Sequence, residues 1–227
     1  MDRLIPRNAT DAVKSPRPAP KEIRPLNREQ ARTLLNAARG DRFEAVYVLA
    51  ITTGLREGEL LALRWEDLNL EEGKLSVRRS ISVTKAGLSF NAPKSAKSRR
   101  SVQLTASAVD ALRQHRAAQN SERLRLGSLW ENNDLVFPGY SGQPMRSYSL
   151  TDGPFKRLLK TADLPQTTRF HDLRHTCATL LLLKGVHPKF VQELLGHATI
   201  SITLDTYSHV LPTMGDQASK AMEEALM

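Results

Sequence analysis

The hydrophobic residues of this 227-residue chain change their spacing between Leu68 and Leu104. On either side of that segment they recur three or four positions apart, which is the spacing of one face of an α-helix. Within it they alternate with polar residues, which indicates antiparallel strands with one buried face. The alternating pairs are Leu75/Val77, Ile81/Val83 and Val102/Leu104. The chain is therefore expected to be an α+β, mainly helical domain with a small antiparallel three-stranded sheet.

Capping residues and glycines set the expected helix limits. Asn27 followed by Gln30 has the sequence of a capping box, and Thr105 precedes a long apolar-periodic run that reaches about Leu126. Gly40 and Gly54 each follow the last periodic residue of a segment. The expected helices cover residues 27–40, 43–53, 57–63, 105–126, 151–162, 171–184, 188–195, 199–207 and 216–226.

Prolines separate the first residues from the rest. Residues 1–25 contain five of the twelve prolines, together with lysines and arginines, and are expected to be an extended linker. Residues 26–215 then form one domain. Residues 216–227 are expected to form a last helix with an apolar stripe of Ala218, Ala221, Met222 and Ala225, which packs on its own domain or on a neighbouring protomer.

Basic residues are concentrated in the alternating segment. The chain has 33 Lys and Arg against 24 Asp and Glu, a formal net charge of +9, and residues 74–100 contain eight basic and no acidic residues. Such a run favours a polyanion, with nucleic acid ahead of anionic lipid, although a solvated surface would have the same composition. The candidate DNA-binding residues are Arg78, Arg79, Lys97, Arg99 and Arg100.

The cysteine and apolar content point to one compartment. The single cysteine, Cys177, excludes an intramolecular disulfide framework and suits a reducing cytoplasm. No apolar run has membrane-spanning length, and the first residues lack the apolar stretch of a signal peptide. We therefore expect a cytoplasmic chain without a membrane partner.

One helix start could bind an anion. His171, Arg174 and His175 lie near the N-terminus of an expected helix, opposite a buried stripe. That stripe consists of Leu173, Cys177, Leu180 and Leu181. An imidazole and a guanidinium three residues apart could grip a phosphate there, where the helix dipole also favours an anion. A solvated helix start is the alternative, and a zinc site is weaker because there is no His-Glu-x-x-His.

Three other segments contain candidate catalytic residues, and each is weak evidence for a catalytic site when taken alone. Arg56 follows a glycine turn and precedes Glu59, which could orient it, although such an arginine is usually on the surface. His197 lies in a tight turn after Gly196, and Tyr207 shares a helical face with core residues, which suits a core tyrosine equally well. Lys94 lies between two strands, where a solvated lysine is common.

In this order, the segments resemble the tyrosine recombinase (phage integrase) family. The family's first arginine box resembles Thr53–Leu60, its sheet lysine resembles Lys94, and its His-x-x-Arg box resembles His171–Arg174. The Leu-Gly-His turn resembles Leu195–His197, and Tyr207 follows ten residues later. The similarity covers most of the chain, from about residue 27 to residue 212.

The resemblance implies the catalytic core of a site-specific recombinase, which cleaves and rejoins DNA strands through a 3′-phosphotyrosine. Its implied catalytic set is Arg56, Lys94, His171, Arg174, His197 and Tyr207, with Lys97 as a competitor for the place of the sheet lysine. In this scheme Tyr207 attacks, His171 assists removal of its proton, and Lys94 protonates the leaving oxygen. The arginines hold the phosphate, His197 donates a hydrogen bond to it, and Glu59 orients Arg56. No cofactor or metal is expected.

The expected partner is double-stranded DNA, bound as a tetramer by a full-length protein and as a monomer by the isolated domain. Family members usually carry an upstream core-binding domain, so residues 1–25 are interpreted as a linker or as a remnant of that domain. The main alternative is a truncated, non-catalytic DNA-binding remnant of a mobile element. A type IB topoisomerase agrees less well with the Leu-Gly-His turn, and a metal-dependent nuclease would need a carboxylate cluster that the sequence does not contain.

Overall fold

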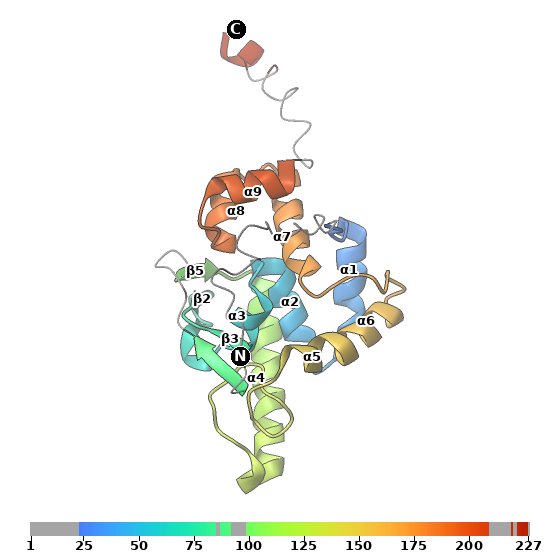
Figure 1. Ribbon diagram of the computed structural model, residues 1–227, viewed down its shortest axis with the longest axis vertical. Helices are drawn as coiled ribbons and strands as arrows, with labels where there is room; N and C mark the ends of the chain where they lie inside the picture. The colour runs from blue at the N-terminus through green and yellow to red at the C-terminus, as the bar shows by residue number, and fades with distance from the viewer. Residues whose placement is uncertain (1–22, 85–86, 92–98, 209–218, 220–221, 227) are drawn as a thin grey trace, which may run out of the picture.

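The computed structural model describes residues 23–84, 87–91, 99–208, 219 and 222–226. It confirms the mainly helical α+β architecture (Figure 1). The helices are α1 (Arg28–Ala37), α2 (Glu44–Thr53), α3 (Glu57–Leu61), α4 (Ala106–Leu126), α5 (Ser147–Leu150), α6 (Lys156–Thr161), α7 (Asp172–Leu183), α8 (Pro188–Leu195) and α9 (Ile200–Tyr207). The strands are β1 (Leu68–Asn69), β2 (Lys74–Val77), β3 (Ser80–Thr84), β4 (Gly87–Asn91) and β5 (Arg100–Gln103).

Side-chain caps begin the helices where the sequence indicated. The Asn27 carboxamide accepts from the Gln30 amide at 2.8 Å, and the Gln30 side chain accepts from the Asn27 amide at 3.0 Å. The Thr105 hydroxyl accepts from the Ala108 amide at the start of α4. The starts predicted for α1 and α4 are thereby confirmed, since each cap satisfies an amide that the first turn leaves without a partner, whereas α1 ends at Ala37, before the predicted Gly40.

The helix predicted for residues 151–162 has a different form. It begins earlier, at Ser147, and residues 151–155 form a π-helical turn between α5 and α6. Pro154 lies inside that turn. Because proline has no amide proton and its ring clashes with an α-helical carbonyl, a widened turn is the expected response.

The strands form two separate ladders. The predicted three-stranded antiparallel sheet is present with the order β1-β2-β5, and Leu75 lies opposite Val102. Ile81 and Val83, which were expected in the same sheet, belong to a second, two-stranded ladder of β3 and β4. The β3 strand packs against α3, where Gly58 is close enough to the Ile81 carbonyl that a Cβ would lie 2.6 Å from it.

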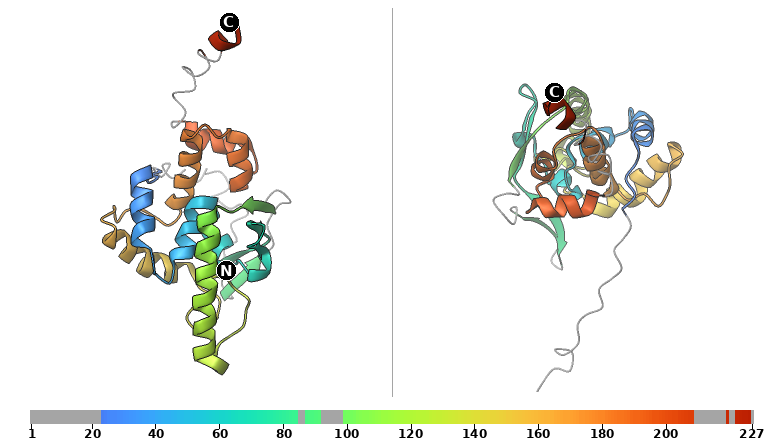
Figure 2. Two further views of the ribbon diagram at one scale, coloured as in Figure 1. Left: turned by 180° about the vertical axis from the view of Figure 1, so that it is seen from behind. Right: turned by 90° about the horizontal axis from the view of Figure 1, so that it is seen from above.

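The core is built around α2. This helix is buried on nearly all sides and packs against α4 and α7, with the strands on one flank and α1 and α6 on the other (Figures 1 and 2). The α8–α9 pair covers one end of the molecule, and α4 projects at the opposite end. Leu26 is buried, and its amide donates to the Thr176 hydroxyl at 2.9 Å, which anchors the start of the domain on α7.

Several sequence predictions lie outside the described residues. They include Lys94 and Lys97, most of the linker at residues 1–25, and residues 216–218 and 220–221 of the helix predicted at residues 216–226. Residues 222–226 of that segment are helical.

Candidate active site

The first candidate arginine follows a left-handed turn. Gly54 ends α2 with φ of 62°, and a Cβ there would lie 2.5 Å from Leu195 Cδ2, so the close approach of α2 to the end of α8 requires glycine. Arg56 is the residue before α3 and has extended backbone geometry. Its side chain is 41% exposed, so the guanidinium lies at the surface of the turn.

Arg174 is buried, although the sequence placed it opposite the core. It lies in the first turns of α7 and is 3% exposed. Its two terminal nitrogens donate to the Gly54 carbonyl at 2.7 Å and the Leu195 carbonyl at 2.8 Å. Burial and the nearby Arg56 cation lower the pKa of Arg174 to about 9, so the group stays charged at neutral pH. No carboxylate of the described residues forms an ion pair with it.

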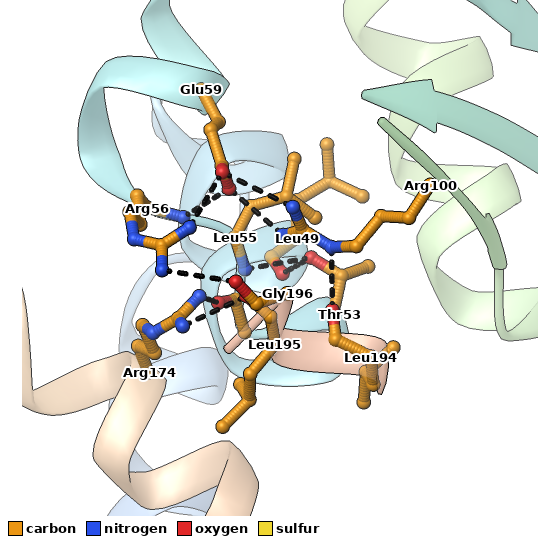
Figure 3. A network of polar contacts seen from close by, with 11 residues as sticks. Leu49, Thr53, Leu55, Arg56, Glu59, Arg100, Arg174, Leu194, Leu195 and Gly196 are labelled. Atoms are coloured by element: carbon orange, nitrogen blue, oxygen red, sulfur yellow. Dashed lines mark hydrogen bonds and ion pairs between the residues drawn. The ribbon is translucent and has the colours of Figure 1, made fainter. Parts of the chain in front are cut away.

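Glu59 joins two further guanidinium groups (Figure 3). One carboxylate oxygen accepts from Arg56 at 3.0 Å, and the two oxygens accept from Arg100 at 3.1 and 2.9 Å. Burial alone would raise the pKa of Glu59, but the hydrogen bonds and charges of Arg100 and Arg56 hold it below its usual value. The carboxylate is therefore ionised, and it contacts Arg56 in the way expected of an orienting group.

Arg56, Arg100 and Arg174 all donate hydrogen bonds to backbone carbonyls at the end of α8. Its last carbonyls accept one guanidinium each: Leu194 from Arg100 at 2.7 Å, Leu195 from Arg174 and Gly196 from Arg56 at 3.3 Å. These carbonyls lie at the negative end of the helix dipole and would otherwise lack partners. Gly196 has φ of 67° and ends the helix in a left-handed cap. The turn therefore fixes the spacing of three positive charges (Figure 3).

His197 follows this turn and contacts α9. Its Nδ1 lies 2.8 Å from the Thr203 hydroxyl, which is buried. Burial, followed by the charges of Arg174 and Arg56, lowers the pKa of His197 to about 4. A neutral ring whose Nδ1 accepts from Thr203 carries its proton on Nε2, where it can be donated to an anion.

Tyr207 ends α9 and is 1% exposed. Its hydroxyl lies 2.8 Å from Nδ1 of His175. Burial raises the pKa of Tyr207 to about 12, although the Arg174 charge acts in the opposite direction. His171 is exposed one turn before His175, and their ring centroids are 5.0 Å apart. Partial removal of water, together with nearby arginines, lowers the pKa of His171.

The arrangement thus brings together most of the predicted catalytic residues. Arg56, Glu59 and Arg174 meet at the end of α8, His197 follows directly, and Tyr207 reaches α7. Two residues with close contacts in this site had no catalytic or orienting role in the sequence interpretation, Arg100 and His175. The His-x-x-Arg-His order contained a signal for His175, whereas nothing local distinguishes Arg100 from its basic neighbours.

The predicted DNA-binding arginines differ in exposure. Arg78 is 57% exposed at its side chain and Arg99 is exposed, as a phosphate contact requires. The prediction for Arg100 does not agree with its position, because its side chain is 7% exposed and pairs with Glu59. Arg79 is half-buried and bound by carboxylates, at 2.9 Å from Glu66 and 3.0 Å from Asp67.

Within the described part of the chain, no group of three His, Cys, Asp or Glu side chains is arranged to hold a metal ion. Among the same residues, no helix combines the length and apolarity needed to span a bilayer. Cys177 is buried, as its place on the apolar stripe predicted, and burial raises the pKa of its thiol to about 12.

Residues 24–214 match the model of the phage integrase family, so the chain belongs to that family. A tyrosine recombinase XerC-like protein of Caldanaerobacter subterraneus is 36% identical over 89% of this chain and 54% of its own length. An integrase of Streptomyces ambofaciens is 32% identical over the same two shares, 89% and 54%. The chain thus spans about half the length of these curated relatives.

Solved structures agree with the family. The Tn1549 transposon integrase in complex with transposon right end DNA has a TM-score of 0.76 and 26% identity, over 92% of this chain and 68% of that one. The XerA recombinase has a TM-score of 0.68 and 27% identity, over 90% and 66%. The predicted class of fold, a tyrosine recombinase catalytic core, is confirmed.

Proposed function

We propose that residues 26–215 are the catalytic domain of a site-specific DNA recombinase that cleaves and rejoins DNA strands through a 3′-phosphotyrosine at Tyr207. The observation that carries this proposal is the cluster of Arg56, Arg100 and Arg174, in which Glu59 pairs with Arg56 and Arg100 while Arg174 is bound by backbone carbonyls. The cluster keeps an excess of positive charge. Attack on a phosphodiester builds up about two negative charges on the phosphoryl oxygens, which such an excess would stabilise.

The reaction is a transfer of the phosphoryl group between two oxygens. The Tyr207 oxygen forms a bond to phosphorus, the bond from phosphorus to the 5′ oxygen breaks, and the phenol proton passes to a histidine at the start of α7, a role that the sequence assigned to His171. In this scheme Arg56 and Arg174 bind the non-bridging oxygens, His197 donates a hydrogen bond to them, and Lys94 protonates the leaving oxygen. Attack by a 5′ hydroxyl on the phosphotyrosine reverses each step and needs no external energy source.

The partners follow from this chemistry. The substrate is double-stranded DNA, and the solved DNA complex of the Tn1549 integrase supports that choice. Residues 1–25 would link the domain to an upstream DNA-binding part, and residues 216–227 would contact a neighbouring protomer. We propose a tetramer on DNA for the full-length protein, a monomer for this chain alone, and a cytoplasmic location.

Covalent trapping tests the function without knowledge of the target. The chain is incubated with a pool of short duplexes of randomised sequence, each nicked so that cleavage releases a fragment and prevents rejoining. We expect a protein–DNA adduct that survives denaturing electrophoresis, and sequencing of its DNA supplies the preferred duplex. Tyr207→Phe should bind DNA and form no adduct, whereas the matched control Tyr148→Phe, an exposed tyrosine of α5, should form as much as the unchanged chain.

Two results would contradict the proposal. Adducts from Tyr207→Phe would exclude this tyrosine as the nucleophile. Binding by the unchanged chain without any adduct would identify the alternative, a non-catalytic DNA-binding remnant.

A further inference from the structure

The hydroxyl of Tyr207 contacts a histidine that is not the first of the His-x-x-Arg segment. Nδ1 of His175 lies 2.8 Å from the Tyr207 oxygen, and the ring centroids are 5.7 Å apart. His175 lies on α7 one residue after Arg174, and Tyr207 is the last residue of α9. No hydrogen bond joins His171 to Tyr207 in the described structure, and His171 is exposed where Tyr207 is buried.

Tyr207 is buried among apolar side chains, and His175 beside it is half-buried. Tyr207 belongs to a small core with Ala178, Leu182, Val191 and Leu195, and it is 1% exposed. At the edge of this core, Nδ1 of His175 contacts the reacting oxygen. Buried tyrosine hydroxyls usually find one partner, and a ring nitrogen differs from a carbonyl partner because it can take the proton as well as accept the hydrogen bond.

We propose that His175 accepts the proton of Tyr207 when Tyr207 attacks the phosphodiester, and that His171 contacts the phosphate instead of the phenol. This inference rests on the proposed function. The Tyr207 oxygen forms its bond to phosphorus while its proton moves to Nδ1 of His175, and the 5′ oxygen leaves with a proton from Lys94. In rejoining, the 5′ hydroxyl oxygen bonds to phosphorus and gives its proton to Lys94, while the bond between phosphorus and the phenolic oxygen breaks and His175 returns the proton to that oxygen.

The charges around His175 make its pKa depend on bound DNA. The charged and titratable groups that act on it, or on which it acts, are His171, Asp172, Arg174, Arg169 and His197. Burial, followed by His171, lowers the pKa of His175 to about 4, so without DNA the ring is neutral and the phenol keeps its proton. A bound phosphodiester places negative charge beside Arg56 and Arg174. That charge offsets the cations and makes His175 more basic when the substrate is present.

Asparagine separates the hydrogen bond from the proton transfer. In His175→Asn the amide oxygen stands close to the place of Nδ1, so it can accept from Tyr207 but cannot take its proton. His171→Asn makes the same change one turn away. His187→Asn is the matched control, because His187 caps α8 by accepting from the Lys189 amide, a task that asparagine also performs.

Single-turnover adduct formation is measured from pH 6 to pH 9 on the duplex obtained by covalent trapping. We expect His175→Asn to be slower by about 100-fold near neutral pH, with a smaller deficit at high pH, where hydroxide removes the phenol proton. His171→Asn should show a loss that does not depend on pH, and His187→Asn should match the unchanged chain. A duplex with a sulfur in place of the leaving 5′ oxygen needs little protonation of the leaving group, and it should leave the His175→Asn deficit in place.

An unchanged rate in His175→Asn, or a pH-dependent deficit in His171→Asn alone, would overturn the assignment. Nitrogen-15 spectra of the histidine rings provide a test that needs no variant at His175. One Nδ1 signal should shift between the unchanged chain and Tyr207→Phe, and spectra without such a shift would overturn the contact. If the unchanged chain forms no adduct at all, the proposed function fails, and this inference fails with it.

Discussion

The arginines at the end of α8 and the basic residues of the strands have different kinds of partner. Arg174 is held by two carbonyl oxygens, and Arg56 by a carbonyl and by a carboxylate that it shares. Arg79, between β2 and β3, is bound by both Glu66 and Asp67, and Lys74 of β2 lies 2.7 Å from Glu72. Arg174 and Arg56 are oriented while most of their charge is kept, whereas Arg79 and Lys74 are neutralised by carboxylates, and Arg78 and Arg99 stay exposed.

The number of basic residues in a segment therefore differs from the net positive charge that the segment presents to a ligand. Residues 74–100 contain no acidic residue, but the fold brings carboxylates from the flanking segments against them. A carbonyl dipole orients a guanidinium without cancelling its formal charge, so the few arginines at the α8 end should act on an anion more strongly than the longer run.

The largest effect is expected at Arg174. Arg174→Ala should slow adduct formation by about 1,000-fold, because it removes a preorganised charge from the phosphate. Arg174→Lys should recover little, since one ammonium cannot reproduce a planar fork that spans two carbonyls. The matched strand variant Arg79→Ala should change the rate by less than about threefold, in keeping with a neutralised side chain. Equal losses at the two positions would show that Arg79 acts on the phosphate as strongly as Arg174 does.

The next effect concerns stability at Glu59. Glu59→Gln leaves Arg100 buried without a full charge partner and should lower the free energy of unfolding by about 3 kcal/mol in denaturant titrations. Since the pKa of Glu59 is held below its usual 4.5, its contribution is present above that pH and is lost as the pH falls through the lowered value. The difference between the two proteins should therefore narrow in acid. Glu72→Gln, in an exposed pair, should leave the unfolding midpoint unchanged.

A smaller effect is expected in the salt dependence of DNA binding. Arg78→Gln and Arg99→Gln should each reduce the slope of log affinity against log salt by about 0.9, as the loss of one phosphate contact does. Arg79→Gln should change the slope less, because Glu66 and Asp67 already occupy its guanidinium. Fluorescence anisotropy at several salt concentrations measures all three. A slope that falls as much for Arg79 as for Arg78 would show that DNA displaces those carboxylates.

The smallest effect is expected from metal removal. Since guanidinium groups would neutralise the phosphate, adduct formation in excess EDTA should equal that in magnesium at matched ionic strength. Abolition by the chelator would mean that the arginines do not provide the charge on their own.

Local signals predicted much of the fold. The capping box at Asn27 and the cap at Thr105 are decided by residues within one turn, so the starts of α1 and α4 could be derived from the sequence. The pairing of β3 with β4 in a ladder of their own depends on which edge each strand meets, and alternation alone carries no such information.

In the candidate active site, too, local features could be predicted from the sequence and long-range contacts could not. The glycine turns before Arg56 and His197 could be predicted from the sequence, because left-handed backbone favours glycine. Arg100 was assigned to the surface because its partners, Glu59 and the Leu194 carbonyl, are 41 and 94 positions away. The burial of Arg174 was missed for the same reason, since its partners are carbonyls that no side-chain pattern reveals.

The three arginines at the end of α8 bind the main chain of residues 194–196 and not its side chains. Contacts of this kind depend on the position at which the helix ends, and not on the identity of the side chains there. Exchange of Leu194 for another apolar residue would keep all three contacts. A single residue inserted into α8 would turn the carbonyls by about 100° and move every arginine out of register together. The length of this short helix is therefore under tighter constraint than its composition.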